Sequence, residues 1–304
     1  MRIVFMGSPD FAIPSLEKLH DSSHEIAAVV SNVDKRRGRR SQPSPTPVKA
    51  RALELGLPVI TAEALDDPAF HQQLKALEAD LFVVVAFRIL PESLLALPRK
   101  GSINLHASLL PKYRGAAPIH WAVMQGEQVT GCTIFFLDDQ VDTGKIIKQQ
   151  QTKIGLNETT GDVYDRLKEM GSSLLVDAVV EIAEDSYQLT KQNHEEATPA
   201  PKLFTDDCRI NFDRPAKVIH DNIRGLSPFP TAWALLDGKR FNMYRSGLGP
   251  DTSLAPGELE MQQDQLLAGC SRGTVILEKV QLQGKKRMSG KDFMNGYNGP
   301  NRLE

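Results

Sequence analysis

The chain begins with MRIVFMGSPDFAIPSLEKL, residues 1–19, and this stretch contains one complete βα unit. An apolar run at residues 2–6 leads directly into the turn residues Gly-Ser-Pro-Asp, and an amphipathic stretch follows at residues 11–19. This order is typical of a strand that enters a helix through a tight turn. We therefore expect an α/β domain to start at the N-terminus.

The alternation of apolar runs and amphipathic stretches continues along the chain. It predicts strands at residues 25–31, 59–60, 81–86, 102–106 and 133–137, helices at 48–55, 70–77 and 160–183, and a hairpin around Gly144. Residues 81–86 are apolar without alternation, as in a strand that is covered on both faces. The pattern therefore predicts a parallel sheet flanked by helices.

A polar stretch with prolines separates this region from the rest. Residues 190–206 carry no apolar periodicity, so we interpret them as a linker. After a short helical segment at 216–224, short apolar runs are separated by Gly, Asp and Asn, at residues 232–236, 241–244, 265–268 and 274–282. Such runs predict a small β-barrel. The expected domains are residues 1–189 and 207–304.

Composition excludes several classes of protein. With 304 residues and a formal net charge of -2, the chain is long enough for two domains and is not a general polycation. Its longest apolar run, residues 81–87, is far shorter than the roughly 20 residues that span a bilayer. Three cysteines without a CxxC pair, and an N-terminus without a long apolar signal region, indicate the reducing cytoplasm.

The first candidate site lies in GSINLHASLLPKYRGAAPI, residues 101–119. Asn104 and His106 are two residues apart on a predicted strand, so they project from one face, about 6.5 to 7 Å apart along the chain. An amide donor beside an imidazole suits the stabilisation of an oxyanion and proton movement at a carbonyl carbon. Two solvated polar residues at a strand end fit the same pattern, and the spacing leaves both interpretations open.

A second candidate is FFLDDQVDTGKII, residues 135–147, where an apolar strand runs into Asp138, Asp139 and Asp142. A carboxylate at a strand end can orient a histidine and favour its charged form. Asp-Thr-Gly is equally good turn chemistry, and the spacing singles out none of the three aspartates. No histidine pair stands at ligand spacing beside them, so we expect no metal site.

Basic residues gather in two places. Residues 35–40 read KRRGRR and precede a proline-rich stretch, and a second cluster comprises Lys285, Lys286 and Arg287 with Lys291. A cationic loop at the rim of an α/β sheet suits a polyanionic substrate, because it can neutralise phosphates. Each cluster alone is also compatible with a solvated charged loop.

Together these segments resemble the methionyl-tRNA formyltransferase family over the whole length of the chain. The resemblance is carried by FMGSPDFA (5–12), PSPTPVK (43–49), VVVAFRILP (83–91), INLHASLLPKYRGAAPI (103–119), DDQVDTG (138–144), PAPKL (199–203), IRGLSPFPTAW (223–233) and GKKRMSGKDFMNG (284–296). It implies a Rossmann-like formyltransferase domain, followed by an OB-fold-like β-barrel domain that helps to hold tRNA.

Carried over by position, the resemblance also implies roles for single residues. The family's catalytic trio falls on Asn104, His106 and Asp142. The folate-binding residues would be Phe87, Arg88, Ile89, Leu90, Ser108, Leu109, Leu110, Pro111 and Asp138. The tRNA-binding residues would be Arg36, Arg37, Arg39, Arg40, Lys285, Lys286 and Arg287. The basic loop places its charges earlier than the commoner family pattern, and Phe87-Arg88 stands where Tyr-Gly is frequent.

The implied reaction transfers the formyl group of 10-formyltetrahydrofolate to the α-amine of initiator methionyl-tRNA, in a monomer that needs neither metal nor membrane. Asn104 and a protonated His106 would stabilise the tetrahedral oxyanion, while Asp142 orients the imidazole and helps to relay a proton. Other enzymes with the same Asn-x-His pattern are alternatives, namely sugar-nucleotide and glycinamide ribonucleotide formyltransferases and a formyltetrahydrofolate hydrolase. A non-catalytic tRNA-binding protein is an alternative of another class.

Overall fold

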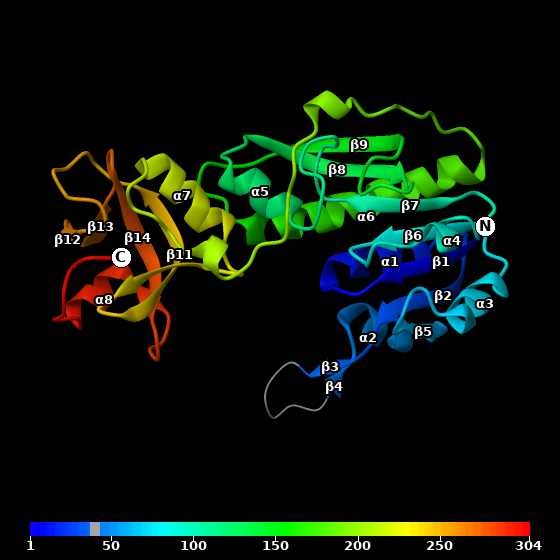
Figure 1. Ribbon diagram of the computed structural model, residues 1–304, viewed down its shortest axis with the longest axis horizontal. Coiled ribbons are helices and arrows are strands. Elements are labelled where there is room, and N and C mark those ends of the chain that lie inside the picture. Colours follow the sequence, from blue (N-terminus) through cyan, green and yellow to red (C-terminus); the bar gives the residue numbers. More distant parts are fainter. Residues whose placement is uncertain (37–42) are drawn as a thin grey trace. The chain divides into compact units, whose positions relative to one another are not determined.

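The computed structural model describes residues 1–36 and 43–304. The chain divides into two compact units, which Figure 1 shows as ribbons. The first unit comprises Met1–Gly115, Gly131–Thr152 and Asp165–Pro199, and the second comprises Ala116–Thr130, Lys153–Tyr164 and Ala200–Glu304. Two stretches that precede the predicted linker therefore pack with the C-terminal unit, and the last boundary falls within that linker.

The first unit is built on a seven-stranded sheet with the order β5-β2-β1-β6-β7-β8-β9. The strands are β1 Arg2–Gly7, β2 Glu25–Asn32, β5 Val59–Ala62, β6 Leu81–Val85, β7 Ser102–His106, β8 Val129–Phe136 and β9 Ile146–Lys153. From β5 to β7 neighbouring strands run parallel, but β8 runs antiparallel to β7. The prediction of a parallel sheet is wrong at this edge, because an apolar pattern reports burial and not strand direction.

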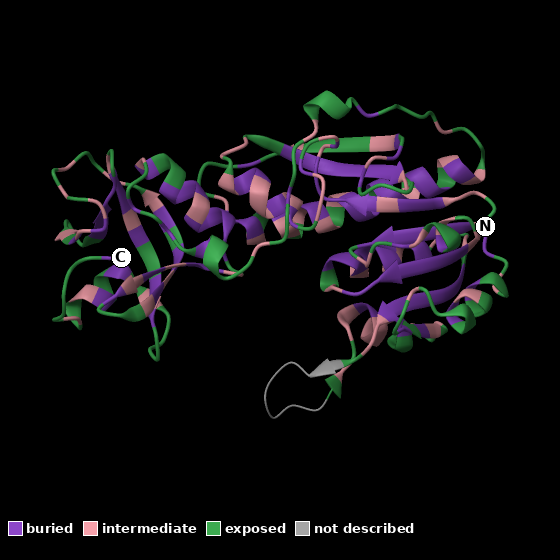
Figure 2. Cartoon of the chain, in the orientation of Figure 1, coloured by how far each residue is buried: buried purple, intermediate pink, exposed green. Residues whose placement is uncertain are grey.

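Helices accompany this sheet on both faces. Their bounds are α1 Ile13–His20, α2 Pro47–Glu54, α3 Pro68–Lys75, α4 Glu92–Leu95 and α6 Thr160–Ala183. A separate short strand pair is formed by β3 Lys35–Arg36 and β4 Pro43–Ser44. Val4 and Met6 of β1 share a core cluster with Phe70 of α3 and Leu94 of α4. Phe5 points to the other face and is equally buried, so both faces are covered. Figure 2 shows the central strands as buried.

Turn and cap residues explain two of the sequence segments quoted above. A Cβ atom on Gly7 would lie 2.9 Å from the Cβ of Ala12 and 3.0 Å from the carbonyl oxygen of Val85, so the turn after β1 requires glycine. The Thr46 side chain accepts a hydrogen bond from the Lys49 N–H, and a proline follows as the first residue of α2. These residues therefore set the entry into helices.

The second unit is an antiparallel sheet with the order β10-β11-β14-β13-β12, with β15 paired to β14. Its elements are α5 Pro118–Met124, α7 Ala216–Gly225, β10 Ala232–Leu236, β11 Lys239–Leu248, β12 Leu259–Gln262, β13 Gln265–Gly269, β14 Thr274–Leu282, β15 Met288–Ser289 and α8 Gly290–Asn295. Three short 3₁₀ helices complete the elements of the described residues, at Asp10–Ala12, His194–Glu196 and Asp206–Cys208.

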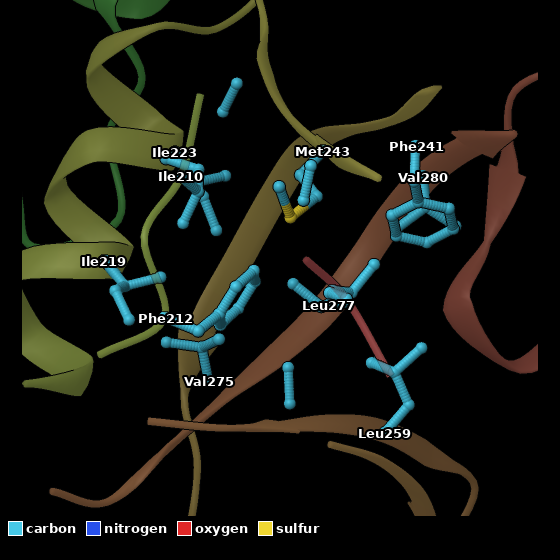
Figure 3. Close-up of a cluster of buried hydrophobic side chains, with 14 of the residues drawn as sticks. Ile210, Phe212, Ile219, Ile223, Phe241, Met243, Leu259, Val275, Leu277 and Val280 are labelled. Atoms are coloured by element: carbon cyan, nitrogen blue, oxygen red, sulfur yellow. The ribbon is translucent and has the colours of Figure 1, made fainter. Parts of the chain in front are cut away.

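The last residues of the chain close this sheet into a barrel. Leu235 and Glu304 exchange two backbone hydrogen bonds of 2.8 and 2.9 Å beside β10. The Leu303 N–H donates to the Gly257 carbonyl oxygen at 2.8 Å, at the start of β12. The C-terminal segment thus bridges the two end strands, as the predicted small β-barrel requires. Figure 3 shows part of the apolar core inside it, to which α7 contributes Ile219.

Among the residues that the structure describes, no helix has the length and apolar character needed to cross a bilayer.

Replacing Leu303 with Ala should lower the free energy of unfolding of the second unit by about 2 to 5 kcal/mol, because a buried leucine leaves a cavity. Both tryptophans of the chain, Trp121 and Trp233, lie in this unit, so urea unfolding followed by tryptophan fluorescence measures the change. Leu248 is 52% exposed, and Leu248→Ala is the matched control, with an expected change within about 0.5 kcal/mol. Equal midpoints for the two variants would contradict closure by the C-terminal segment.

Candidate active site

A cavity of about 100 Å³ in the first unit opens between the end of β6 and the loop that follows β8. Its lining comprises Val84, Phe87, Arg88, Ile89, Leu90, Leu95, Asn104, Leu137, Asp138, Asp139, Gln140, Val141 and Asp142. The loop after β8 runs back along β7, because the Leu137 N–H donates to the Ser102 carbonyl oxygen while Asp142 approaches His106. The antiparallel direction of β8 therefore lays this loop across the polar face of β7.

Asn104 and His106 occupy that polar face. Asn104 is half-buried and lines the cavity, and His106 is only 5% exposed. The His106 Nε2 lies 2.8 Å from the carbonyl oxygen of Tyr113, which only accepts hydrogen bonds, so this nitrogen carries a hydrogen and donates it. The other ring nitrogen, Nδ1, is then free to face a carboxylate.

That carboxylate belongs to Asp142. Its Oδ2 lies 3.7 Å from the His106 Nδ1, an ion-pair distance when the imidazole is protonated, and accepts a hydrogen bond from the Gly115 N–H at 2.8 Å. The Asp142 side chain is nearly as buried as that of His106. The structure therefore brings all three members of the implied trio together, with Asn104 and Asp142 in one cavity.

The other two aspartates of the loop are placed differently. The Asp138 Oδ1 accepts hydrogen bonds from the Gln140 N–H at 3.2 Å and from the Thr143 hydroxyl at 2.7 Å, which makes it a turn residue. Asp139 is exposed at the cavity. Three aspartates that spacing could not distinguish thus have three different surroundings, and Asp142 is the one beside His106.

The residues implied to bind folate fall into two groups. The segment from Phe87 to Leu90 and Asp138 line the cavity. The stretch from Ser108 to Pro111 does not: the buried Ser108 hydroxyl donates to the Lys112 carbonyl oxygen at 2.7 Å, and the Leu110 N–H donates to the Thr133 hydroxyl at 3.1 Å. These contacts shape the loop that carries Tyr113 and do not reach the cavity wall.

Arg88 has a structural role in that wall. Its guanidinium donates to the carbonyl oxygens of Ala62 at 2.6 Å and Glu63 at 3.0 Å, and lies 5.4 Å from the centre of the Phe87 ring. Burial lowers its pKa. Because two backbone acceptors hold the charged group, Arg88 ties β5 to the segment after β6.

Several residues of the site escaped the sequence analysis. Gln192, which is 6% exposed, donates to the carbonyl oxygens of Asp142 and Gly144 at 2.9 and 2.8 Å. The Thr198 hydroxyl accepts from the Tyr113 N–H at 2.9 Å. Both lie in the segment interpreted as a linker, where an absent apolar periodicity gave no sign of burial. Arg114, within a quoted motif, donates to the Gln192 Oε1 at 2.6 Å.

The implied tRNA-binding residues are only partly described. Arg36 belongs to the short strand β3, whereas Arg37, Arg39 and Arg40 lie outside the described residues. In the second unit the side chains of Lys285, Lys286 and Arg287 are exposed. The Arg287 guanidinium lies 3.5 Å from the centre of the Tyr244 ring, a cation–π contact that holds it at the surface.

The described residues do not favour a metal site or a cysteine nucleophile. Within residues 1–36 and 43–304, no group of three His, Cys, Asp or Glu side chains converges as metal ligands. Cys132 is buried in β8, and desolvation raises its pKa to about 12, so its thiol stays protonated and unreactive.

Comparison with known proteins gives relatives that match nearly the whole chain. A family model described as formyl transferase matches residues 1–179, and one described as formyl transferase, C-terminal domain, matches residues 202–298. The methionyl-tRNA formyltransferase of Chlorobium luteolum is 43% identical over 304 residues, 98% of this chain and 97% of the relative. That of Moorella thermoacetica is 43% identical over 300 residues, 98% of this chain and 96% of the relative.

Solved structures share the fold. An N-formyltransferase from Helicobacter canadensis, in complex with folinic acid and dTDP-3-aminofucose, has a TM-score of 0.66 at 21% identity and covers 90% of this chain and 98% of its own. Glycinamide ribonucleotide transformylase 1 from Symbiobacterium toebii has a TM-score of 0.54 at 22% identity, over 64% of this chain and 94% of its own. From the two family models and the 43% identical relatives, we conclude that this chain belongs to the formyl transferase family.

Proposed function

We propose that this protein transfers the formyl group of 10-formyltetrahydrofolate to the α-amino group of initiator methionyl-tRNA. The observation that carries the proposal is the cavity lined by Asn104 and Asp142, with the His106 Nδ1 3.7 Å from the Asp142 carboxylate. An amide, an imidazole and a carboxylate in this arrangement suit the transfer of an acyl group to an amine. The names of the 43% identical relatives support methionyl-tRNA as the acceptor.

The lining of the cavity fits a folate co-substrate. Val84, Leu90 and Leu137 give it apolar walls, which suit the faces of a flat heterocycle. The loop that contains Asp138 and Gln140 adds polar groups at the edge, which suit the hydrogen-bonding rim of a pterin. We assign the binding of the donor to this cavity.

In the proposed reaction the neutral amine of the methionyl ester attacks the formyl carbon, and a C–N bond forms. Charge builds on the formyl oxygen, to which the Asn104 amide donates a hydrogen bond, and a protonated His106 supplies positive charge beside it. Asp142 stabilises that imidazolium and helps to pass the proton of the attacking amine to N10. The bond from the formyl carbon to N10 then breaks, and tetrahydrofolate leaves.

Recognition of RNA is assigned to exposed basic residues. We propose that Lys285, Lys286 and Arg287 contact phosphates of the tRNA together with the arginines of the loop at residues 35–40. Under this proposal residues 1–189 bind folate and carry out the reaction, and residues 207–304 bind tRNA. Residues 190–206 link the domains, while Gln192 and Thr198 among them support the loops of the site. The enzyme would act as a cytoplasmic monomer.

The acceptor is tested by incubating the protein with a labelled formyl donor and charged initiator and elongator methionyl-tRNAs. We expect label on the initiator methionyl-tRNA, at a rate well above that on the elongator. Formate release without RNA would indicate a hydrolase, and labelling of an aminosugar nucleotide alone would indicate a sugar formyltransferase. Either result overturns the proposed acceptor.

Asn104→Ala and Asp142→Asn should each lower kcat about 100-fold or more, because loss of one group that stabilises an oxyanion costs about 2.7 to 4 kcal/mol. Single-turnover assays with saturating substrates measure the loss, and circular dichroism checks the fold. Asp177 is exposed on α6, and Asp177→Asn serves as the matched control with unchanged kcat. Near-normal turnover of Asp142→Asn would refute its catalytic role.

Lys286→Ala should weaken tRNA binding and reduce the slope of log affinity against log salt by about 1, because one phosphate contact is lost. Titration of labelled tRNA at several salt concentrations gives the slope. Lys75→Ala removes another exposed lysine, from α3 in the first unit, and should leave the slope unchanged. If both variants keep the original slope, Lys286 does not contact the RNA.

A further inference from the structure

Gln192 uses every hydrogen-bonding position of its side chain on the loops of the site. Its amide nitrogen donates to the carbonyl oxygens of Asp142 at 2.9 Å and Gly144 at 2.8 Å. Its Oε1 accepts from the Nη2 of Arg114 at 2.6 Å and from its Nε at 3.2 Å. An amide offers two donors and two lone pairs, so no capacity is left over. A buried side chain satisfied in this way fixes whatever it contacts.

The turn that Gln192 contacts needs such support. Asp142 has a φ of 57°, in the left-handed region that costs energy for any residue other than glycine, although aspartate adopts it more readily than most. A Cβ atom on Gly144 would lie only 1.7 Å from the Phe136 carbonyl oxygen, so the turn also presses closely on β8. Strained backbone of this kind persists only where surrounding contacts hold it. Gln192 supplies one hydrogen bond at each of the two constrained residues.

The segment that contains Gln192 also holds the loop of Tyr113, which lies on the other side of His106. Thr198 accepts from the Tyr113 N–H through its hydroxyl and from the Arg114 N–H through its carbonyl oxygen, both at 2.9 Å. Tyr113 in turn accepts the Nε2–H of His106. The partners of both imidazole nitrogens are therefore anchored to residues 192–198.

We propose that Gln192 is a positioning residue that sets the distance between the Asp142 carboxylate and His106. The inference rests on the catalytic role proposed above for Asp142. Gln192 fixes the backbone of Asp142 and the guanidinium of Arg114, whose neighbour Gly115 holds the carboxylate. A displacement of about 1 Å at a reacting group can cost roughly 100-fold in rate, so the loss of these hydrogen bonds should lower kcat.

A double-mutant cycle with Gln192→Ala and Asp142→Asn tests the proposal. Gln192→Ala should lower kcat at least 10-fold and leave the KM values for tRNA and donor within about 2-fold. In the Asp142→Asn background the same change should cost less than about 2-fold, because Gln192 acts through the missing carboxylate. Asn193 is exposed, and its side chain hydrogen-bonds to Glu195 and Glu196, so Asn193→Ala is the matched control with unchanged kcat.

A second variant distinguishes the positioning role from a loss of activity caused by misfolding. Gln192→Glu keeps the side-chain volume and the acceptor for Arg114, but it presents a carboxylate oxygen to two carbonyl oxygens. Protonation restores one donor, so the ratio of its kcat to that of Gln192→Ala should rise as the pH falls from about 8 to about 6. A purely structural role predicts a ratio that does not change with pH.

The outcomes separate the two hypotheses. If Asp142→Asn keeps near-normal turnover, the proposed catalytic site fails, and the role of Gln192 fails with it. If Asp142→Asn is strongly impaired but Gln192→Ala behaves like Asn193→Ala, only the positioning role is wrong. Additive losses in the cycle, or a parallel rise in both KM values, would likewise overturn it.

Discussion

A carboxylate and an imidazole that share a buried site need hydrogen bonds to replace the water they have lost. His106 is 5% exposed and Asp142 is 9% exposed, and they face one another at 3.7 Å. Each has one backbone partner beyond this pair, namely the Tyr113 carbonyl oxygen for the imidazole and the Gly115 N–H for the carboxylate. Both partners come from one loop, so the geometry of that loop controls the pair.

The fold provides this arrangement through the direction of one strand. β6 and β7 run parallel, so the segment after β6 emerges beside His106 at the end of β7. β8 runs antiparallel to β7 and ends near Ser102, so its loop must return along β7 past Asn104 to bring Asp142 to His106. If β8 were parallel, its loop would start beside His106 and would not cover Asn104. The edge that the sequence pattern misjudged is therefore the edge that builds the cavity.

The sequence predicted what depends on local pattern, and it missed what depends on long-range pairing. Apolar runs located most strands and the long helix α6, because burial repeats along an element. The Asn-x-His spacing placed two side chains on one face, because alternation is a property of the strand itself. Strand direction, barrel closure by Leu303 and the burial of Gln192 all depend on partners far away in the chain. No window around Gln192 contains Asp142, so its burial in a polar stretch left no local signal.

Burial also depends on distant partners, and it separates the basic residues that stabilise the fold from those that are exposed to a binding partner. Arg224 lies in the quoted segment IRGLSPFPTAW, yet it is 3% exposed, pairs with Asp221 at 2.7 Å, and donates to the carbonyl oxygens of Gly155 and Glu158. A guanidinium that is buried and paired with a carboxylate is not accessible to a phosphate, so its motif reports packing between α7 and residues 153–164. Lys286, by contrast, keeps its charge in solvent, where attraction to a polyanion costs little desolvation. Burial, more than motif membership, therefore indicates which basic residues of this chain are accessible to a polyanion.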